Sequence, residues 1–348
     1  MKKEELFITQ EIGSFRKPDY LSRNFHAILG TAEFRNLAER AAGETLKMFT
    51  DAGLMNLGVG GEMYRWEMYE HLARHVGNLV FHGKVRSFDN RYYNKGSVIG
   101  EISRKSSAHM EELEFVLQST RKKIKVPITG PYTMTDWSFN DHYASRSDIA
   151  NAFADIIHEE VLDLQAKWKL YRPDEKLEIQ IDEPAATSHP DEMDIVIESV
   201  NRSVRGIKGI ESSIHICYSR DYSLIYDRMP DLELDGLNLE YANRDILSAG
   251  TGKERRPGYA DLERFREIQS TLSRPKFIGV GVTDVHIDTV EPVSLIADRI
   301  RTAAEIVGDP SLVRLNPDCG LRTRSRDIGI RKIRNMVEAR NIVMKEIS

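Results

Sequence analysis

Eight short apolar segments recur along this chain of 348 residues, and they constrain its fold more than any other feature. Each ends in polar residues or glycine, and most are followed by a longer stretch with helical periodicity. The segments are 7–13, 54–61, 126–131, 177–184, 213–219, 235–240, 276–284 and 312–320. Strand and helix alternating eight times is typical of a parallel (β/α)8 barrel. We therefore predict an α/β fold of the TIM-barrel type, with a doubly wound open sheet as the alternative.

Five stretches between these segments have the period of amphipathic helices, and in the first of them apolar residues recur from Phe34 to Leu46. The predicted helices are 33–50, 147–170, 191–206, 293–307 and 326–345. Residues 83–102 lack this period and are predicted to form an extended excursion that helps to cover the barrel mouth. No Pro/Ser-rich or low-complexity linker divides the chain, so we predict that residues 1–348 form a single domain.

Composition points to a partner that is a small molecule. A formal net charge of −5 gives no reason to expect binding to nucleic acid. Two cysteines, Cys217 and Cys319, cannot build a disulfide framework and are predicted to be reduced thiols. No stretch approaches the ~18 consecutive apolar residues of a membrane span, and no apolar core follows the basic start. We expect a cytoplasmic protein that binds neither nucleic acid nor membrane.

Reactive side chains stand at the ends of nearly all the predicted strands, where a TIM barrel builds its active site. His215 and Cys217 alternate on one strand, so both can face the barrel interior. Glu240 ends the next strand and Cys319 the eighth. One imidazole, two thiolates and a displaceable carboxylate suit tetrahedral zinc with room for a substrate. The alternatives are buried packing of the His-x-Cys pair and a salt bridge between Glu240 and Arg244.

The motifs at these strand ends resemble one known family. In chain order they are EIGSF (11–15), GGEMYRWEMYE (60–70), ITGPYTMTDWSF (128–139), QIDEPA (180–185), IHICYS (214–219), LNLEYANRD (237–245), GVTDVH (281–286) and LNPDCGLRTR (315–324). Together they are similar to the C-terminal catalytic barrel of cobalamin-independent methionine synthase. The resemblance implies a zinc-dependent methyltransferase that transfers a methyl group to the thiol of L-homocysteine and forms L-methionine.

The resemblance also implies a role for individual residues. The zinc ligands would be His215, Cys217, Glu240 and Cys319. Homocysteine would be held by Ile12, Gly13, Ser14, Glu62 and Asp182, with the two carboxylates on its ammonium group. The methyl donor would be bound by Arg91, Tyr92 and Trp137. His286 would be the proton donor. From the residues alone, Glu62 and Asp182 are more often salt-bridge partners, for example of Arg65, and Trp137 is more often packed in a core.

The methyl donor depends on two departures from the family. Ser188 stands where the family has a folate-contacting glutamate, and Tyr92 stands where it often has cysteine. The chain resembles the short archaeal-type form that consists of the core barrel alone. Folate chemistry requires a general acid, for which His286, oriented by Asp284, is the candidate, whereas cob(I)alamin leaves without a proton. We predict a corrinoid donor, as methylcobalamin or on a corrinoid protein, with a methyl-folate or methyl-pterin as the alternative.

Three other functions are compatible with the residues. One is methyl transfer to another thiol such as coenzyme M, although Glu62 and Asp182 would repel a sulfonate. The second is a non-catalytic module that binds zinc or a methyl carrier. The third is a metal-free barrel like uroporphyrinogen decarboxylase.

Overall fold

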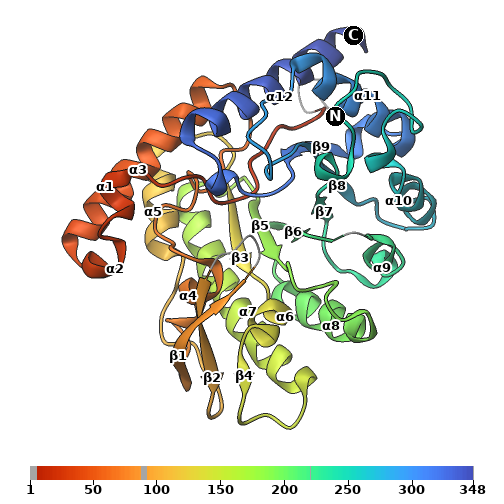
Figure 1. Ribbon diagram of the computed structural model, residues 1–348. Coiled ribbons are helices and arrows are strands. Elements are labelled where there is room, and N and C mark those ends of the chain that lie inside the picture. Colours follow the sequence, from red (N-terminus) through yellow and green to blue (C-terminus); the bar gives the residue numbers. More distant parts are fainter. Residues whose placement is uncertain (1–5, 88–91, 220, 348) are drawn as a thin grey trace.

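Parallel strands form the centre of the protein, and helices surround them (Figure 1). The computed structural model describes residues 6–87, 92–219 and 221–347. Six strands pair side by side in the order β3 (Lys125–Thr129), β5 (Leu177–Asp182), β6 (Ile210–Ile216), β7 (Gly236–Leu239), β8 (Phe277–Thr283) and β9 (Val313–Pro317). All five pairings are parallel. Each strand lies within one of the predicted apolar segments or overlaps it.

The first two predicted strands close the ring through single β-bridges. Thr9 pairs with Leu315 of β9, Gln10 pairs with Asn56, and Asn56 pairs with Lys123 just before β3, all in parallel. Eight parallel segments therefore form a closed ring, which confirms the predicted TIM barrel.

Segment 54–61 is a bridge and a turn rather than a regular strand. Gly58, Gly60 and Gly61 have φ angles of 54°, 72° and 80°, and Glu62 follows with φ 58°. This left-handed region is open to glycine and costly for other residues, so the backbone leaves extended geometry directly after Asn56. The turn carries Glu62 to the barrel mouth.

Helices cover the outside of the barrel, and the five predicted ones are confirmed to within two residues at each end. The longer helices are α3 (Ala32–Asp51), α5 (Met110–Ser119), α7 (Arg146–Tyr171), α8 (Met193–Val204), α10 (Leu262–Gln269), α11 (Val293–Val307) and α12 (Arg326–Glu346). The shorter ones are α1 (Asp19–Ser22), α2 (Phe25–Ile28), α4 (Met68–Ala73), α6 (Pro131–Asp136) and α9 (Ser223–Tyr226). Within the described ranges, no helix combines the length and apolar character needed to cross a membrane.

The predicted excursion is an antiparallel hairpin. Strands β1 (Leu79–Arg86) and β2 (Tyr92–Val98) pair with each other, and β4 (Phe139–Asn140) adds to β2 in parallel. The hairpin projects from the barrel (Figure 1). Because β2 begins at Tyr92, the hairpin brings this side chain to the cavity described below.

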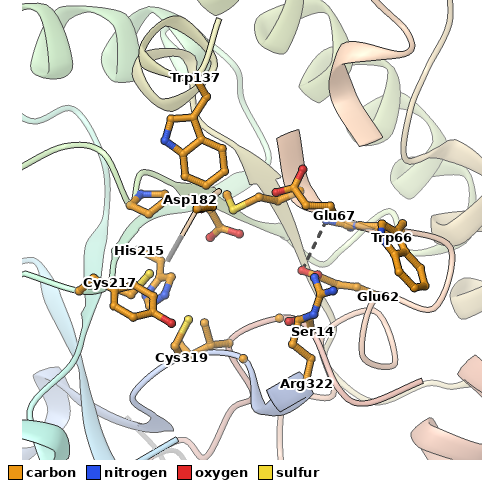
Figure 2. Close-up of a pocket in the computed structure, with 18 of the residues that line it drawn as sticks. Ser14, Glu62, Trp66, Glu67, Trp137, Asp182, His215, Cys217, Cys319 and Arg322 are labelled. Carbon is orange, nitrogen blue, oxygen red and sulfur yellow. Dashed lines mark ion pairs between the residues drawn. The ribbon is translucent and has the colours of Figure 1, made fainter. Parts of the chain in front are cut away.

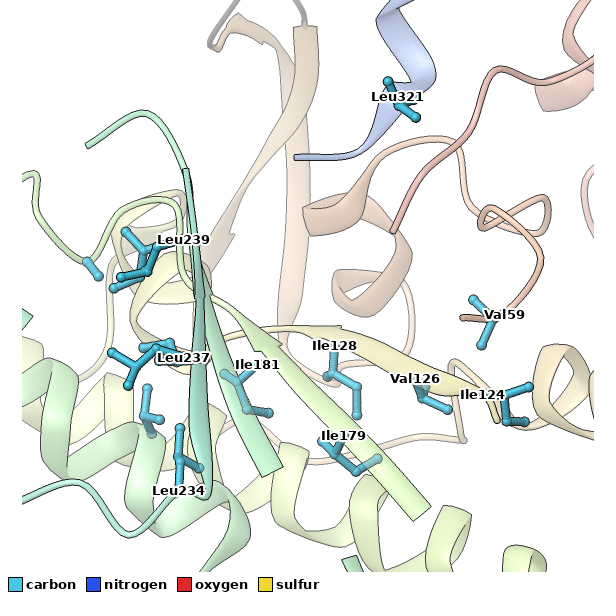
Figure 3. Close-up of a cluster of buried hydrophobic side chains, with 14 of the residues drawn as sticks. Val59, Ile124, Val126, Ile128, Ile179, Ile181, Leu234, Leu237, Leu239 and Leu321 are labelled. Carbon is cyan, nitrogen blue, oxygen red and sulfur yellow. The ribbon is translucent and has the colours of Figure 1, made fainter. Parts of the chain in front are cut away.

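Side chains alternate along the barrel strands between an apolar outer face and a polar inner face. Ile179 and Ile181 of β5 and Leu237 of β7 are fully buried in the hydrophobic cluster around the strands (Figure 3). Gln180 and Asn238, which stand between such residues, point the other way and hydrogen-bond to each other inside the barrel. The apolar face holds the helices on the sheet, and the polar face lies beneath the site.

Candidate metal and substrate site

A cavity at the carboxyl ends of the strands brings the predicted site residues together (Figure 2). It is lined by the predicted substrate-binding residues, by three predicted metal ligands and by two predicted donor-site residues: Ile12, Gly13, Ser14, Glu62, Asp182, His215, Cys217, Cys319, Tyr92 and Trp137. Glu240 and His286 are not among the lining residues. Arg91 lies outside the described residues.

His215, Cys217 and Cys319 form a cluster at one side of this cavity. One ligand atom of each lies within 4.8 Å of the others. His215 Nδ1 donates to the carbonyl oxygen of Asn238 at 2.9 Å, and its buried Nε2 has no hydrogen-bond partner. An imidazole fixed by a backbone carbonyl, with its other nitrogen turned to two thiols, is the usual arrangement of a histidine that ligates a metal. The donor set therefore fits a thiophilic metal ion.

The contacts within the cluster shift the pKa values of its three side chains in different directions. A hydrogen bond from Cys217 holds the pKa of Cys319 well below that of an ordinary thiol. The same contact, together with burial, raises the pKa of Cys217 well above it. Burial opposes a charged imidazole, but the Cys319 sulfur outweighs it and raises the pKa of His215 to about 9. Of the two sulfurs, Cys319 is therefore the one whose surroundings favour the thiolate.

Asp318 ties the Cys319 turn to the turn that follows β7. Its carboxylate is fully buried and accepts hydrogen bonds from the backbone N–H groups of Tyr241, Ala242 and Asn243 at 2.7 to 2.9 Å. The segment after Glu240 and the segment that carries Cys319 are therefore held together.

Glu240 is not part of the three-residue cluster, and its carboxylate is hydrogen-bonded by loop groups. Its Oε2 accepts from the Tyr218 N–H at 2.7 Å and from Asn243 Nδ2 at 3.0 Å, and its Oε1 faces His286 Nε2 at 3.2 Å. Its carboxylate is not paired with Arg244, whose guanidinium forms an ion pair with Asp261 instead. Glu240, the predicted fourth ligand, thus follows β7 directly as expected, but its carboxylate contacts Tyr218, Asn243 and His286.

His286 sits on Glu240 rather than in the cavity wall. Its backbone N–H donates to Asp284 Oδ1 at 2.7 Å, and its ring packs edge-on against Tyr218 with centroids 5.1 Å apart. Burial lowers the pKa of His286, but the facing Glu240 carboxylate outweighs this effect and raises it to about 9. The contact between Asp284 and His286 is thus made by the His286 backbone N–H, and the orienting role of Asp284 stays a prediction.

Two of the carboxylates that line the cavity, Glu62 and Asp182, are each held by a neighbour. Glu62 Oε1 lies 3.6 Å from Arg65, whose guanidinium is already paired with the buried Glu112. Asp182 Oδ1 accepts from Gln180 Nε2 at 2.7 Å, and burial raises the pKa of Asp182 to about 7. The predicted pairing of Glu62 with Arg65 exists as a long contact.

Two aromatic residues, Tyr92 and Trp137, also line the cavity. Trp137 stacks on Tyr93 with centroids 4.8 Å apart and an interplanar angle of 25°. Tyr92 is half exposed at the start of the hairpin. One face of the Trp137 ring is therefore covered by protein, in keeping with the packing role weighed for it.

The structure adds Trp66, Glu67 and Met68 to the site, residues that pattern reasoning did not single out. Glu67 Oε2 caps α4 by accepting from the Glu70 N–H at 2.9 Å, and burial raises the pKa of Glu67 to about 7. Trp66 and Glu67 also line a neighbouring cavity. The sequence places Glu67 immediately before a helix, where an acidic cap is favourable, and this position predicts a cap rather than a site residue.

Known proteins resemble this chain over almost its whole length. A family model described as the catalytic domain of cobalamin-independent synthase matches residues 7–341. Methionine synthase of Thermoplasma volcanium is 62% identical over 341 residues, covering 98% of this chain and 99% of that protein. Methionine synthase of Pyrococcus horikoshii is 34% identical over 344 residues, covering 97% and 93%. The structure of a B12-independent methionine synthase from Shewanella sp. W3-18-1 in complex with selenomethionine matches with a TM-score of 0.81 at 27% identity, covering 98% and 99%.

Proposed function

Because the chain belongs to the cobalamin-independent methionine synthase family and is a methyltransferase, we propose that it methylates the thiol of L-homocysteine to form L-methionine. One observation carries this proposal. The thiophilic cluster of His215, Cys217 and Cys319 and the carboxylates of Glu62 and Asp182 line the same cavity. A ligand with a thiol at one end and an ammonium group at the other matches both.

We propose zinc as the metal, held by His215, Cys217 and Cys319, because one imidazole and two thiolates are a preferred zinc donor set. When bound, zinc would supply a Lewis acid that keeps the substrate thiol ionised at neutral pH. Glu240 is proposed as the fourth, exchangeable ligand. The Tyr218 N–H and Asn243 Nδ2 would hold its carboxylate when it is not on the ion.

The chain's own residues would orient the amino acid. Glu62 and Asp182 would accept the ammonium group, and the Ile12–Gly13–Ser14 segment would contact the carboxylate end. A side chain at Gly13 would meet Glu62, since a Cβ there would lie 2.7 Å from Glu62 Oε1. A sulfonate thiol such as coenzyme M is disfavoured, because two carboxylates would face its negative group.

We propose a corrinoid as the methyl donor, with Arg91, Tyr92 and Trp137 as the residues that bind it. The substrate sulfur would form a bond to the methyl carbon while the cobalt–carbon bond breaks and its electron pair stays on cobalt. This leaving group needs no proton, which suits a site where His286 is engaged with Glu240. A methyl-folate remains the alternative donor, because His286 could serve as its acid after leaving Glu240.

The test is methionine formation by purified, zinc-loaded protein with methylcobalamin and with methyl-tetrahydrofolate, run side by side. Transfer from methylcobalamin supports the full proposal, and transfer from the folate alone replaces the donor. Absence of methionine with both donors at stoichiometric zinc would refute homocysteine as the acceptor. We also propose that residues 1–348 act as one catalytic domain and work in the cytoplasm, where the two thiols stay reduced.

A further inference from the structure

A chain of buried amide side chains crosses the barrel one layer below the cavity. Gln10 Nε2 donates to Asn238 Oδ1 at 2.7 Å, and Asn238 Nδ2 donates to Gln180 Oε1 at 2.9 Å. Gln180 Nε2 then donates to Asp182 Oδ1 at 2.7 Å and to the carbonyl oxygen of Ile12 at 2.8 Å. The three amides have no exposed surface. Because each donor faces the next acceptor, the direction of the chain is fixed, and it ends at Asp182.

The surrounding backbone leaves room for this polar layer. A Cβ on Gly279 of β8 would lie 2.0 Å from Asn238 Oδ1 and 2.6 Å from Asn316 Oδ1. TIM-barrel interiors are dominated by branched apolar side chains. Buried amides are unfavourable unless their hydrogen bonds are made, and they specify one arrangement when they are. A polar layer at this depth is therefore suited to fixing the groups above it.

Gln180 contacts both sides of the predicted amino-acid site. It occupies one oxygen of Asp182, which leaves the second oxygen of that carboxylate to a ligand in the cavity. It also fixes the Ile12 carbonyl at the start of the Ile12–Gly13–Ser14 segment. Asn238, the next amide in the chain, accepts from His215 Nδ1 through its backbone oxygen. The layer thus connects Asp182 and Ile12 to His215 of the proposed metal site.

We propose that Gln180 is a positioning residue that makes the site selective for thiols carrying an α-ammonium group. It acts by holding Asp182 in the one rotamer that presents a free oxygen to that group. This inference rests on the proposed function, in which Asp182 binds the ammonium group of homocysteine. Gln180 does not line the cavity, and its effect on the ammonium group runs through Asp182, whereas its bond to the Ile12 carbonyl concerns the other end of the amino acid.

The test compares homocysteine with 4-sulfanylbutanoate, the same thiol acid without the amino group, on zinc-loaded protein. We define the selectivity ratio as kcat/KM for homocysteine divided by kcat/KM for 4-sulfanylbutanoate. In Gln180→Met this ratio is expected to fall about tenfold to hundredfold, which is the range that hydrogen bonds to charged groups span. The rate with 4-sulfanylbutanoate and the zinc content are expected to stay unchanged. In an Asp182→Asn background, Gln180→Met is expected to leave the ratio as it is, because the residue through which it acts is already neutral.

Gln10→Met is the matched control, since Gln10 is equally buried in the same layer but does not contact Asp182. It is expected to keep the wild-type ratio. An equal loss with both thiols in Gln180→Met, or an unchanged ratio, would overturn the inference. Should Gln180→Met fail to fold, Gln180→Leu removes the same amide donor with a shorter side chain, and the same fall in ratio is required of it.

Calorimetric binding of methionine and of 4-(methylsulfanyl)butanoate gives a second measurement that needs no methyl donor. Methionine is expected to bind more weakly to Gln180→Met by the same factor, and the analogue without the amino group equally well. If wild-type protein makes no methionine from either donor, the proposed function fails while this measurement still decides the role of Gln180. If wild-type protein binds both ligands equally, the inference itself is overturned.

Discussion

The carboxylate of Glu160 in α7 accepts five hydrogen bonds. Its Oε1 accepts from Ser107 Oγ at 2.7 Å, from the N–H groups of Ala108 and His109 at 3.0 and 2.9 Å, and from His109 Nδ1 at 2.9 Å. Its Oε2 accepts from Arg104 Nε at 2.8 Å. The carboxylate therefore joins α7 to the loop that leads into α5, and Glu160→Gln is expected to weaken this joint.

The size of the effect follows from the pKa of this group. Burial alone would raise it, but the hydrogen bonds from His109 and Ser107 prevail and lower the pKa of Glu160 from 4.5 to about 2. A difference of roughly 2.5 units between unfolded and folded states corresponds to about 3 kcal/mol of stability near neutral pH. A depressed pKa stabilises above the unfolded value, and this contribution is lost as the pH falls from about 4.5 toward 2. Glutamine resembles the protonated acid, so the variant should lack the contribution at every pH.

Urea unfolding followed by circular dichroism measures this difference. Wild type is expected to exceed Glu160→Gln by about 3 kcal/mol near pH 7 and by only about 1 kcal/mol near pH 3. Glu159→Gln is the matched control, because Glu159 is the neighbouring, exposed carboxylate of the same helix, and it is expected to change stability by less than ~0.5 kcal/mol. A difference for Glu160→Gln that is equally large at both pH values would refute the charge-based reasoning.

Three further predictions concern the site. Cys319→Ser is expected to lower zinc content, measured by atomic emission, and to abolish methyl transfer while the circular dichroism spectrum stays native; retained zinc with loss of fold would contradict the assignment. Asp182→Asn is expected to raise the KM for homocysteine by roughly tenfold or more, with a smaller change in kcat. The reason is the loss of a charged hydrogen bond to the ammonium group. An unchanged KM in steady-state kinetics would show that Asp182 does not bind the substrate. Gly279→Ala is expected to destabilise the protein by about 1 to 3 kcal/mol in urea unfolding, because its methyl group would displace Asn238; wild-type stability would show that the amide layer yields easily.

The fold was predictable to the extent that it depends on local periodicity. The period of 3.6 gave the α11 boundaries 293–307 as the structure has them, because an amphipathic helix is encoded in its own residues. Segments 7–13 and 54–61 were equally apolar, yet they contribute single β-bridges to the barrel. Glycines with left-handed backbone end the second of these segments early, and apolar content does not report φ angles. The segments were identified correctly, and only their regularity was overestimated.

The site residues, like the fold, were predictable where they depend on a local pattern. Alternation on β6 places His215 and Cys217 on one face, and the structure brings both of them to Cys319. Glu62 and Asp182, which the resemblance assigned to the substrate, both line the cavity, whereas Glu240 and His286 do not. Trp66 and Glu67 were missed because they reach the cavity from a turn whose path depends on tertiary contacts. A capping carboxylate before a helix is common at the surface, so Glu67 carried no specific signal of a site.

Glu240 shows why the direction of a side chain is harder to predict than its face. Period two places it, like Asn238 two residues earlier, on the interior side of β7. Beyond the strand end, its carboxylate is bound by the Tyr218 N–H, and Tyr218 has a left-handed φ of 57° that no strand pattern encodes. A tyrosine held in that region is strained, and such strain persists only where surrounding contacts determine it. The bond between the Tyr218 N–H and Glu240 is such a contact, so the residue after Cys217 helps to fix the position of the Glu240 carboxylate.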